Sequence, residues 1–92
     1  MRQVIVAGNW KLNGSLDSIT SLISGIKVGL GEDNKARVIV CPVALHIGKV
    51  AKLIAGSAIE LGSQNACDQT SGAYTGEISV DMLEEYAVEH VI

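Results

Sequence analysis

Short strand-like runs alternate along this chain with longer segments in which apolar residues recur every three or four positions. The short runs lie at positions 3–7, 37–41 and, more weakly, 59–64. The segments with the longer period lie at positions 15–30, 44–55 and 79–88. The first pattern is typical of strands in a parallel sheet and the second of amphipathic helices. Residues 90–92 resemble the start of a fourth strand, so the order predicts an α/β fold with right-handed crossovers.

Each predicted helix has one apolar face, which is expected to pack on the sheet. The inward positions are Leu16, Ile19, Leu22, Ile23, Ile26 and Leu30 in the first helix, Leu45, Val50, Leu53 and Ile54 in the second, and Met82, Leu83 and Tyr86 in the third. Ser15 or Asp17 is expected to cap the first helix and Ser79 the third. A sheet of this size leaves one face open to water. That face is expected to carry Val4, Val6, Val38 and Val40, or their neighbours.

The chain has 92 residues, 48% of them hydrophobic, and a formal net charge of −3. This length supports one core, so residues 1–92 are expected to hold one domain and no second one, and the apolar content excludes disorder. The longest segment without a charged side chain, residues 38–48, is too short to span a bilayer. No cleavage site follows the N-terminal apolar run, so we expect a cytoplasmic protein without a membrane partner.

Charge is divided unevenly along the chain. Residues 1–59 carry all seven basic side chains, whereas residues 60–92 carry seven acidic ones and no basic one. The acidic end is either a solvated helix surface or one half of a set of ion pairs. With a pI near 5.2 and no basic stripe, we expect no nucleic-acid partner.

The cysteines and histidines lack the spacing of a metal site. Cys41 and Cys67 form neither a CxxC pair nor a zinc-type cluster with His46 and His90. Both thiols are therefore expected to be buried and reduced. Both histidines lack a carboxylate or cysteine partner nearby in the sequence, which favours packed or surface histidines over ligands or bases.

The segment after the first predicted strand carries the most informative side chains. Loops at the carboxyl ends of parallel strands line the ligand sites of α/β folds, so Asn9 and Lys11 are expected to leave the sheet at that end. Asn9 offers an amide donor and acceptor, and Lys11 offers a positive charge for a phosphate or a developing oxyanion. The alternative is a polar turn against which Trp10 packs. The chemistry of these residues leaves both interpretations open.

Four segments in order along the whole chain resemble the triosephosphate isomerase family. They are Ala7-Gly8-Asn9-Trp10-Lys11-Leu12-Asn13-Gly14, Val40-Cys41-Pro42, Gly62-Ser63-Gln64-Asn65 and Gly72-Ala73-Tyr74-Thr75-Gly76-Glu77-Ile78-Ser79. The resemblance implies that residues 1–92 are the N-terminal part of a (β/α)8 TIM barrel, running from its first strand to the start of its fourth. It also implies a cytoplasmic enzyme of glycolysis and gluconeogenesis.

Enzymes of this family interconvert dihydroxyacetone phosphate and glyceraldehyde 3-phosphate by proton transfer through an enediolate, without a metal or an organic cofactor. The resemblance implies that Asn9 and Lys11 contact this substrate. It further implies that Lys11 is catalytic, attracting the phosphate and stabilising negative charge on the substrate oxygens.

The third loop has a different role in the family, because it docks beside the active site of a partner subunit in a homodimer. By this resemblance Tyr74, Thr75, Gly76 and Glu77 belong to the dimer interface, Thr75 steadies the partner's catalytic residues and Glu77 pairs with an arginine. Gln64 and Asn65 are implied to anchor the base of the loop and to support the region of Asn9 and Lys11.

The family also uses a glutamate base, a neutral histidine electrophile and a closing loop. We expect these groups to lie beyond residue 92 in the family's order, so the 92-residue piece is expected to be inactive alone. His90 precedes the position of the electrophile and is not assigned that role. The alternative is a non-catalytic βα module that self-associates to cover its open sheet.

Overall fold

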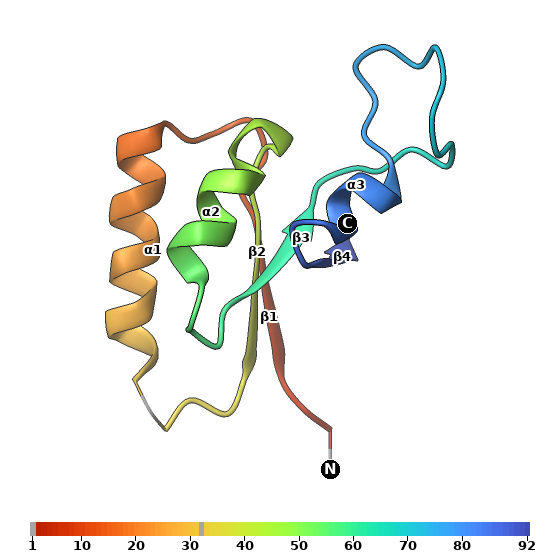
Figure 1. Ribbon diagram of the computed structural model, residues 1–92. Helices are drawn as coiled ribbons and strands as arrows, with labels where there is room; N and C mark the ends of the chain where they lie inside the picture. Colours follow the sequence, from red (N-terminus) through yellow and green to blue (C-terminus); the bar gives the residue numbers. More distant parts are fainter. Residues whose placement is uncertain (1, 32) are drawn as a thin grey trace.

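The computed structural model describes residues 2–31 and 33–92, which form one parallel sheet with helices between its strands (Figure 1). The strands are β1 (Ile5–Asn9), β2 (Arg37–Cys41), β3 (Glu60–Ser63) and β4 (Val88–Val91). The helices are α1 (Leu16–Leu30), α2 (Ile47–Ile54) and α3 (Val80–Glu84), and a 3-10 turn, η1 (Ala44–His46), leads into α2. The strand order β1-β2-β3-β4 with parallel pairing throughout confirms the predicted α/β class.

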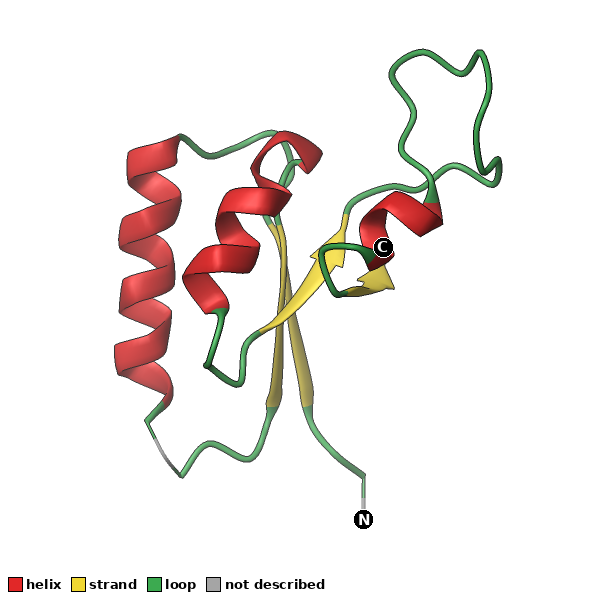
Figure 2. Ribbon diagram, viewed as in Figure 1, coloured by secondary structure: helices red, strands yellow, loops and turns green. Residues whose placement is uncertain are grey.

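The core lies between the sheet and the helices, with α1 and α2 side by side over one face (Figure 2). Its buried members are Ile19, Ile23, Val40, Ile47, Val50, Ile54, Ile59, Leu61, Leu83 and Val88. Burial of β-branched and leucine side chains stabilises the fold, with about 1.5–3 kcal/mol for each side chain fully removed from water.

The predicted first helix forms because its start is capped and its apolar stripe meets the sheet. The Ser15 hydroxyl accepts a hydrogen bond from Ser18 N at 3.1 Å, and the Ser18 hydroxyl accepts one from Ser15 N at 2.8 Å. This reciprocal pair is a capping box that satisfies two otherwise free N–H groups. Ile19 and Ile23 are buried as predicted, whereas Leu16 and Leu22, also expected inward, are exposed.

The predicted burial of Leu45 is wrong, because its side chain is 84% exposed. The segment 44–46 is a 3-10 turn rather than the first turn of an α-helix. The change of period turns Leu45 to solvent and brings Ile47 into the core at the start of α2.

The predicted third helix is too long at its C-terminal end. Ser79 caps it as expected, since its hydroxyl accepts from Met82 N at 3.2 Å, but α3 ends at Glu84. Ala87 has a left-handed backbone with φ 58°, which breaks the helix and allows Val88 to begin β4. Of the expected inward residues Leu83 is buried, while Met82 and Tyr86 are about half exposed.

On the open face of the sheet β2 carries the neighbours of Val38 and Val40, which is one of the two arrangements predicted. Val40 packs in the helix-side core, so alternation along β2 places Arg37, Ile39 and Cys41 on the helix-free face. Val4 and Val6 are 65% and 54% exposed, because β1 lies at the edge of the sheet.

Candidate functional site

The carboxyl ends of β1, β2 and β3 meet at one edge of the sheet, where their loops come together (Figure 1). Asn9 is the last residue of β1, and the loop that follows runs over this edge to the cap of α1. Trp10 N donates to the Cys41 carbonyl at 3.2 Å, which continues the β1–β2 pairing one residue beyond the strand. The loop therefore leaves the sheet in a defined direction.

Lys11 has a left-handed backbone, with φ 54°, that is uncommon for a residue with a side chain. Two side chains hold both of its peptide groups. Asn9 Oδ1 accepts a hydrogen bond from Lys11 N at 2.9 Å, and Gln64 Nε2 donates to the Lys11 carbonyl at 2.8 Å. The same Gln64 Nε2 donates to the Cys41 carbonyl at 3.1 Å. Such over-determined strain is found preferentially at ligand and catalytic sites.

The Lys11 and Asn9 side chains are exposed at this edge. Asn13 Nδ2 donates to the Trp10 carbonyl at 2.9 Å, so the loop is braced on both sides of Lys11. An exposed ammonium on a fixed backbone can attract an anion and hold its position relative to the sheet. The geometry thus provides one cationic contact for a phosphate or oxyanion.

His46 packs against Gly14 at the end of the loop that carries Lys11. The position that a Cβ on Gly14 would occupy is 3.6 Å from His46 Nδ1 and 3.1 Å from Ile19 Cγ2, and Gly14 has φ 122°. His46 Nδ1 is buried without a hydrogen-bond partner among the described residues. These contacts agree with the interpretation of His46 as a packed residue and explain why position 14 favours glycine.

The long loop between β3 and α3 projects away from the sheet (Figure 1). Its base is closed by a parallel bridge between Cys67 and Ser79, with Cys67 N donating to the Ile78 carbonyl at 2.7 Å. Asn65 and Glu77 line a cavity of 220 Å³ at this base. The remaining site residues predicted from the family, Tyr74, Thr75 and Gly76, are exposed in the projecting part.

The structure therefore brings some predicted site residues together and separates others. Asn9, Lys11 and Gln64 form one hydrogen-bonded group at the edge of the sheet. The third-loop residues do not belong to that group. The contact between Gln64 and Lys11 joins residues 53 positions apart, so no local pattern in the sequence announces it.

At the other end of the strands lies a charged cluster that the spacing of the sequence did not reveal. Arg37 donates through Nε to Glu60 Oε2 at 2.8 Å and through Nη2 to Glu60 Oε1 at 2.5 Å. His90 Nε2 lies 3.0 Å from Glu60 Oε1. The hydrogen bond from Arg37, followed by that from His90, lowers the pKa of Glu60 to about 2. The uneven charge distribution was the one feature of the sequence that pointed to this ion pair, since Arg37 lies in the segment with all the basic side chains and Glu60 in the acidic segment 60–92.

The same region contains the donor set that comes nearest to a metal site among the described residues. One ligand atom each of Glu60, Glu89 and His90 lies within 4.8 Å of the other two. Arg37, however, already engages both oxygens of Glu60, and a metal ion would have to compete with this guanidinium. We assign no metal to these residues.

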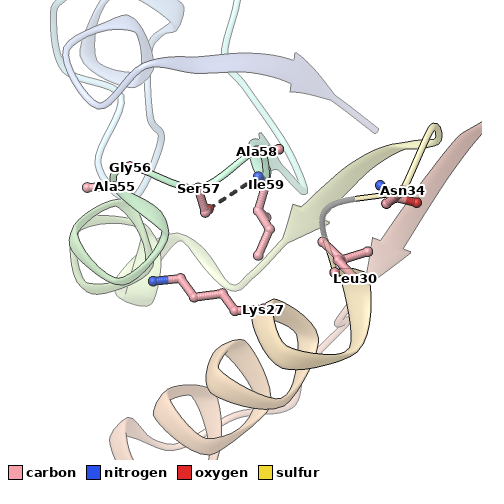
Figure 3. Close-up of a pocket in the computed structure, with 9 residues that line it drawn as sticks. Lys27, Leu30, Asn34, Ala55, Gly56, Ser57, Ala58 and Ile59 are labelled. Carbon is pink, nitrogen blue, oxygen red and sulfur yellow. Dashed lines mark hydrogen bonds between the residues drawn. The ribbon is translucent and has the colours of Figure 1, made fainter.

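A larger cavity, of 530 Å³, lies between the ends of α1 and α2 (Figure 3). Lys27 and Leu30 contribute from α1, and the segment 55–59 contributes from the turn before β3. The C-terminal ends of two helices carry partial negative charge, which disfavours a phosphate there and attracts a cation such as Lys27. This cavity also lies before the strands begin, at the opposite end from Lys11, so it is not the candidate site.

Comparison with known proteins identifies the family. The family model described as triosephosphate isomerase matches residues 4–92. Proteins named triosephosphate isomerase from Ruthia magnifica subsp. Calyptogena magnifica and from Methylococcus capsulatus are each 44% identical over the whole chain, and one from Psychromonas ingrahamii is 42% identical over 98% of it. The chain spans 36–37% of the length of these relatives. Among the described residues no helix has the length and apolarity to cross a membrane. The chain belongs to the triosephosphate isomerase family.

Proposed function

We propose that this chain supplies the first substrate-contacting loop of a triosephosphate isomerase, with Lys11 as its catalytic cation. The observation that carries the proposal is the strained Lys11 backbone, held by Asn9 on one side and by Gln64 on the other. Fixing the backbone fixes where the ammonium can reach, and electrostatic stabilisation requires a charge placed before the reaction begins.

In the proposed reaction, dihydroxyacetone phosphate and glyceraldehyde 3-phosphate interconvert through an enediolate. The Lys11 ammonium attracts the phosphate dianion and stabilises the negative charge that develops on the substrate oxygens. Asn9 offers its amide to the same substrate. The proton transfers themselves need an acid and a base positioned by the rest of the barrel, so turnover is expected only from a protein of the family's full length.

The proposal extends to the third loop and to the cellular setting. We assign Tyr74, Thr75, Gly76 and Glu77 to the interface of a homodimer, and their exposure in a projecting loop supports this assignment. Gln64 and Asn65 support the base of that loop, and the contact of Gln64 with Lys11 favours a second role in the site. We place the enzyme in the cytoplasm.

The test is an isomerase assay on a protein that carries these residues within the family's full length. Lys11→Met removes the charge while keeping much of the side-chain volume, and we expect turnover to fall by at least about a hundredfold, as for loss of an oxyanion contact. Lys27→Met is the matched control, because Lys27 is also exposed but lies at the far end of the strands. Near-normal turnover of Lys11→Met would show that the assignment is wrong.

A further inference from the structure

Strands β2 and β3 approach each other most closely near their carboxyl ends, on the face of the sheet without helices. Cys41 is the last residue of β2 and pairs with Asn9 of β1 on one side. On its other side lies Gly62 of β3, and a Cβ at this position would be only 2.6 Å from Cys41 Sγ. The sulfur of Cys41 therefore occupies the space that a side chain at position 62 would need.

Space, rather than backbone conformation, explains the glycine at position 62. Gly62 is not among the glycines with a positive φ, so a residue with a side chain could adopt its backbone. A Cβ there would also lie 3.3 Å from Ile39 Cγ2 and 3.4 Å from His90 Cβ. Cys41 is 2% exposed, so its sulfur has no open solvent to turn into. A methyl group at position 62 must therefore push β3 away from β2.

The same cysteine connects this packing to the candidate site through its carbonyl group. The Cys41 carbonyl accepts from Gln64 Nε2 at 3.1 Å, and the same nitrogen donates to the Lys11 carbonyl at 2.8 Å. Non-bonded heavy atoms in contact lie about 3.5–4.0 Å apart, so a methyl group at position 62 needs about 1 Å more room. A hydrogen bond of 3.1 Å is near the upper limit for N–H···O and would be lost if the two strands separated by that amount.

We propose that Gly62 is a positioning residue of the site, because its lack of a side chain lets Cys41 lie against β3 and keeps Gln64 within reach of both carbonyls. The inference rests on the proposed function of Lys11. Gly62 acts only through Gln64, so a side chain at position 62 should weaken the hydrogen bond to the Lys11 carbonyl and displace the ammonium.

Moving one heavy atom from position 41 to position 62 tests the proposal in a protein of the family's full length. We expect Gly62→Ala alone to lower turnover about tenfold, because a displaced ammonium stabilises the developing charge less well. Adding Cys41→Ala removes the sulfur and returns the space, so the double variant should recover turnover to within about twofold of the parent. Cys67→Ala is the matched control, since Cys67 lies at the base of the third loop, and it should not restore turnover in Gly62→Ala.

Combination with Gln64→Leu separates positioning from a general loss of stability. Because Gly62 acts through Gln64, Gly62→Ala should lower turnover no further in a protein that already carries Gln64→Leu. A further tenfold loss in that protein would show that Gly62 acts by another route and would overturn the proposal.

The rescue remains decisive even if Gly62→Ala does not fold by itself. The variant Gly62→Ala with Cys41→Ala should then fold and turn over, whereas Gly62→Ala with Cys67→Ala should not. Failure of Cys41→Ala to restore turnover, or equal rescue by Cys67→Ala, would overturn the proposal. Lys11→Met tests the proposed function separately, so a large loss in Lys11→Met beside parental turnover in Gly62→Ala would overturn only the role of Gly62.

Discussion

Strand β3 carries a different kind of polar group at each of its ends. Beyond its carboxyl end, Gln64 donates uncharged hydrogen bonds to the carbonyls of Lys11 and Cys41. At its amino end, Glu60 accepts from Arg37 and contacts His90. Uncharged hydrogen bonds fix backbone geometry regardless of pH, whereas an ion pair follows the protonation of its members. The candidate site is thus positioned by the uncharged hydrogen bonds at the carboxyl end of β3, which depend least on pH.

The largest effect is expected from a change midway between the two ends. Gly62→Ala would place a Cβ 2.6 Å from Cys41 Sγ and 3.3 Å from Ile39 Cγ2. Because this part of the sheet is buried, β3 must shift, and we expect a loss of about 2–3 kcal/mol in the free energy of unfolding. Urea denaturation measures it. Gly29→Ala is the control, since nothing lies within 4 Å of its Cβ position, and it should leave stability unchanged or raise it.

A smaller loss is expected from the carboxyl end alone. Gln64→Leu removes the donor shared by the Lys11 and Cys41 carbonyls, and we expect a loss of about 1–2 kcal/mol in the free energy of unfolding. The loss should be the same at pH 5.5 and pH 7.5, because no charged group is removed. Gln69→Leu is the matched control, as among the described residues the Gln69 side chain donates a hydrogen bond only to its neighbour Asp68. A strongly pH-dependent loss would contradict the distinction between the ends.

The smallest of these effects is expected from acid at the amino end. The pKa of Glu60 is lowered to about 2 in the folded chain and lies near 4.3 for an ordinary glutamate. A lowered pKa means that the stabilisation is present above the ordinary value and is lost as the pH falls from about 5 to about 2. Acid unfolding compared between the parent and Glu60→Gln measures this part. Equal acid sensitivity of the two proteins would contradict the ion pair.

Local patterns in the sequence predicted the elements well and their boundaries less well. Ser15 and Ser79 cap helices as expected, because their hydroxyls satisfy local N–H groups. The end of α3 was not predicted, because alanine rarely adopts a positive φ and the Ala87 side chain gives no indication of one. The exposure of Leu45 was not predicted either, because the 3-10 turn has a different period from the α-helix that was expected there.

The candidate site was predictable only in part. The position of Asn9 and Lys11 after the first strand followed from the parallel order of the elements. The hydrogen bond from Gln64 to the Lys11 carbonyl joins segments that are distant in the sequence, and the family resemblance alone suggested that these segments are close. The contact of His90 with Glu60 depends on one extra residue in β4. Alternation along an ideal strand would have placed Glu89 there, so this cluster could be recognised only from the three-dimensional structure.

The hydrogen bond from Gln64 to the Lys11 carbonyl provides the most direct test of how the catalytic lysine is positioned. In a protein of the family's full length, Gln64→Leu leaves every charge in place and removes the hydrogen bond that fixes the Lys11 carbonyl. We expect turnover to fall about tenfold, because a displaced ammonium stabilises the developing charge less well. Gln69→Leu should retain full turnover. Unchanged turnover in Gln64→Leu would contradict the claim that uncharged hydrogen bonds at this end of the sheet position the catalytic lysine.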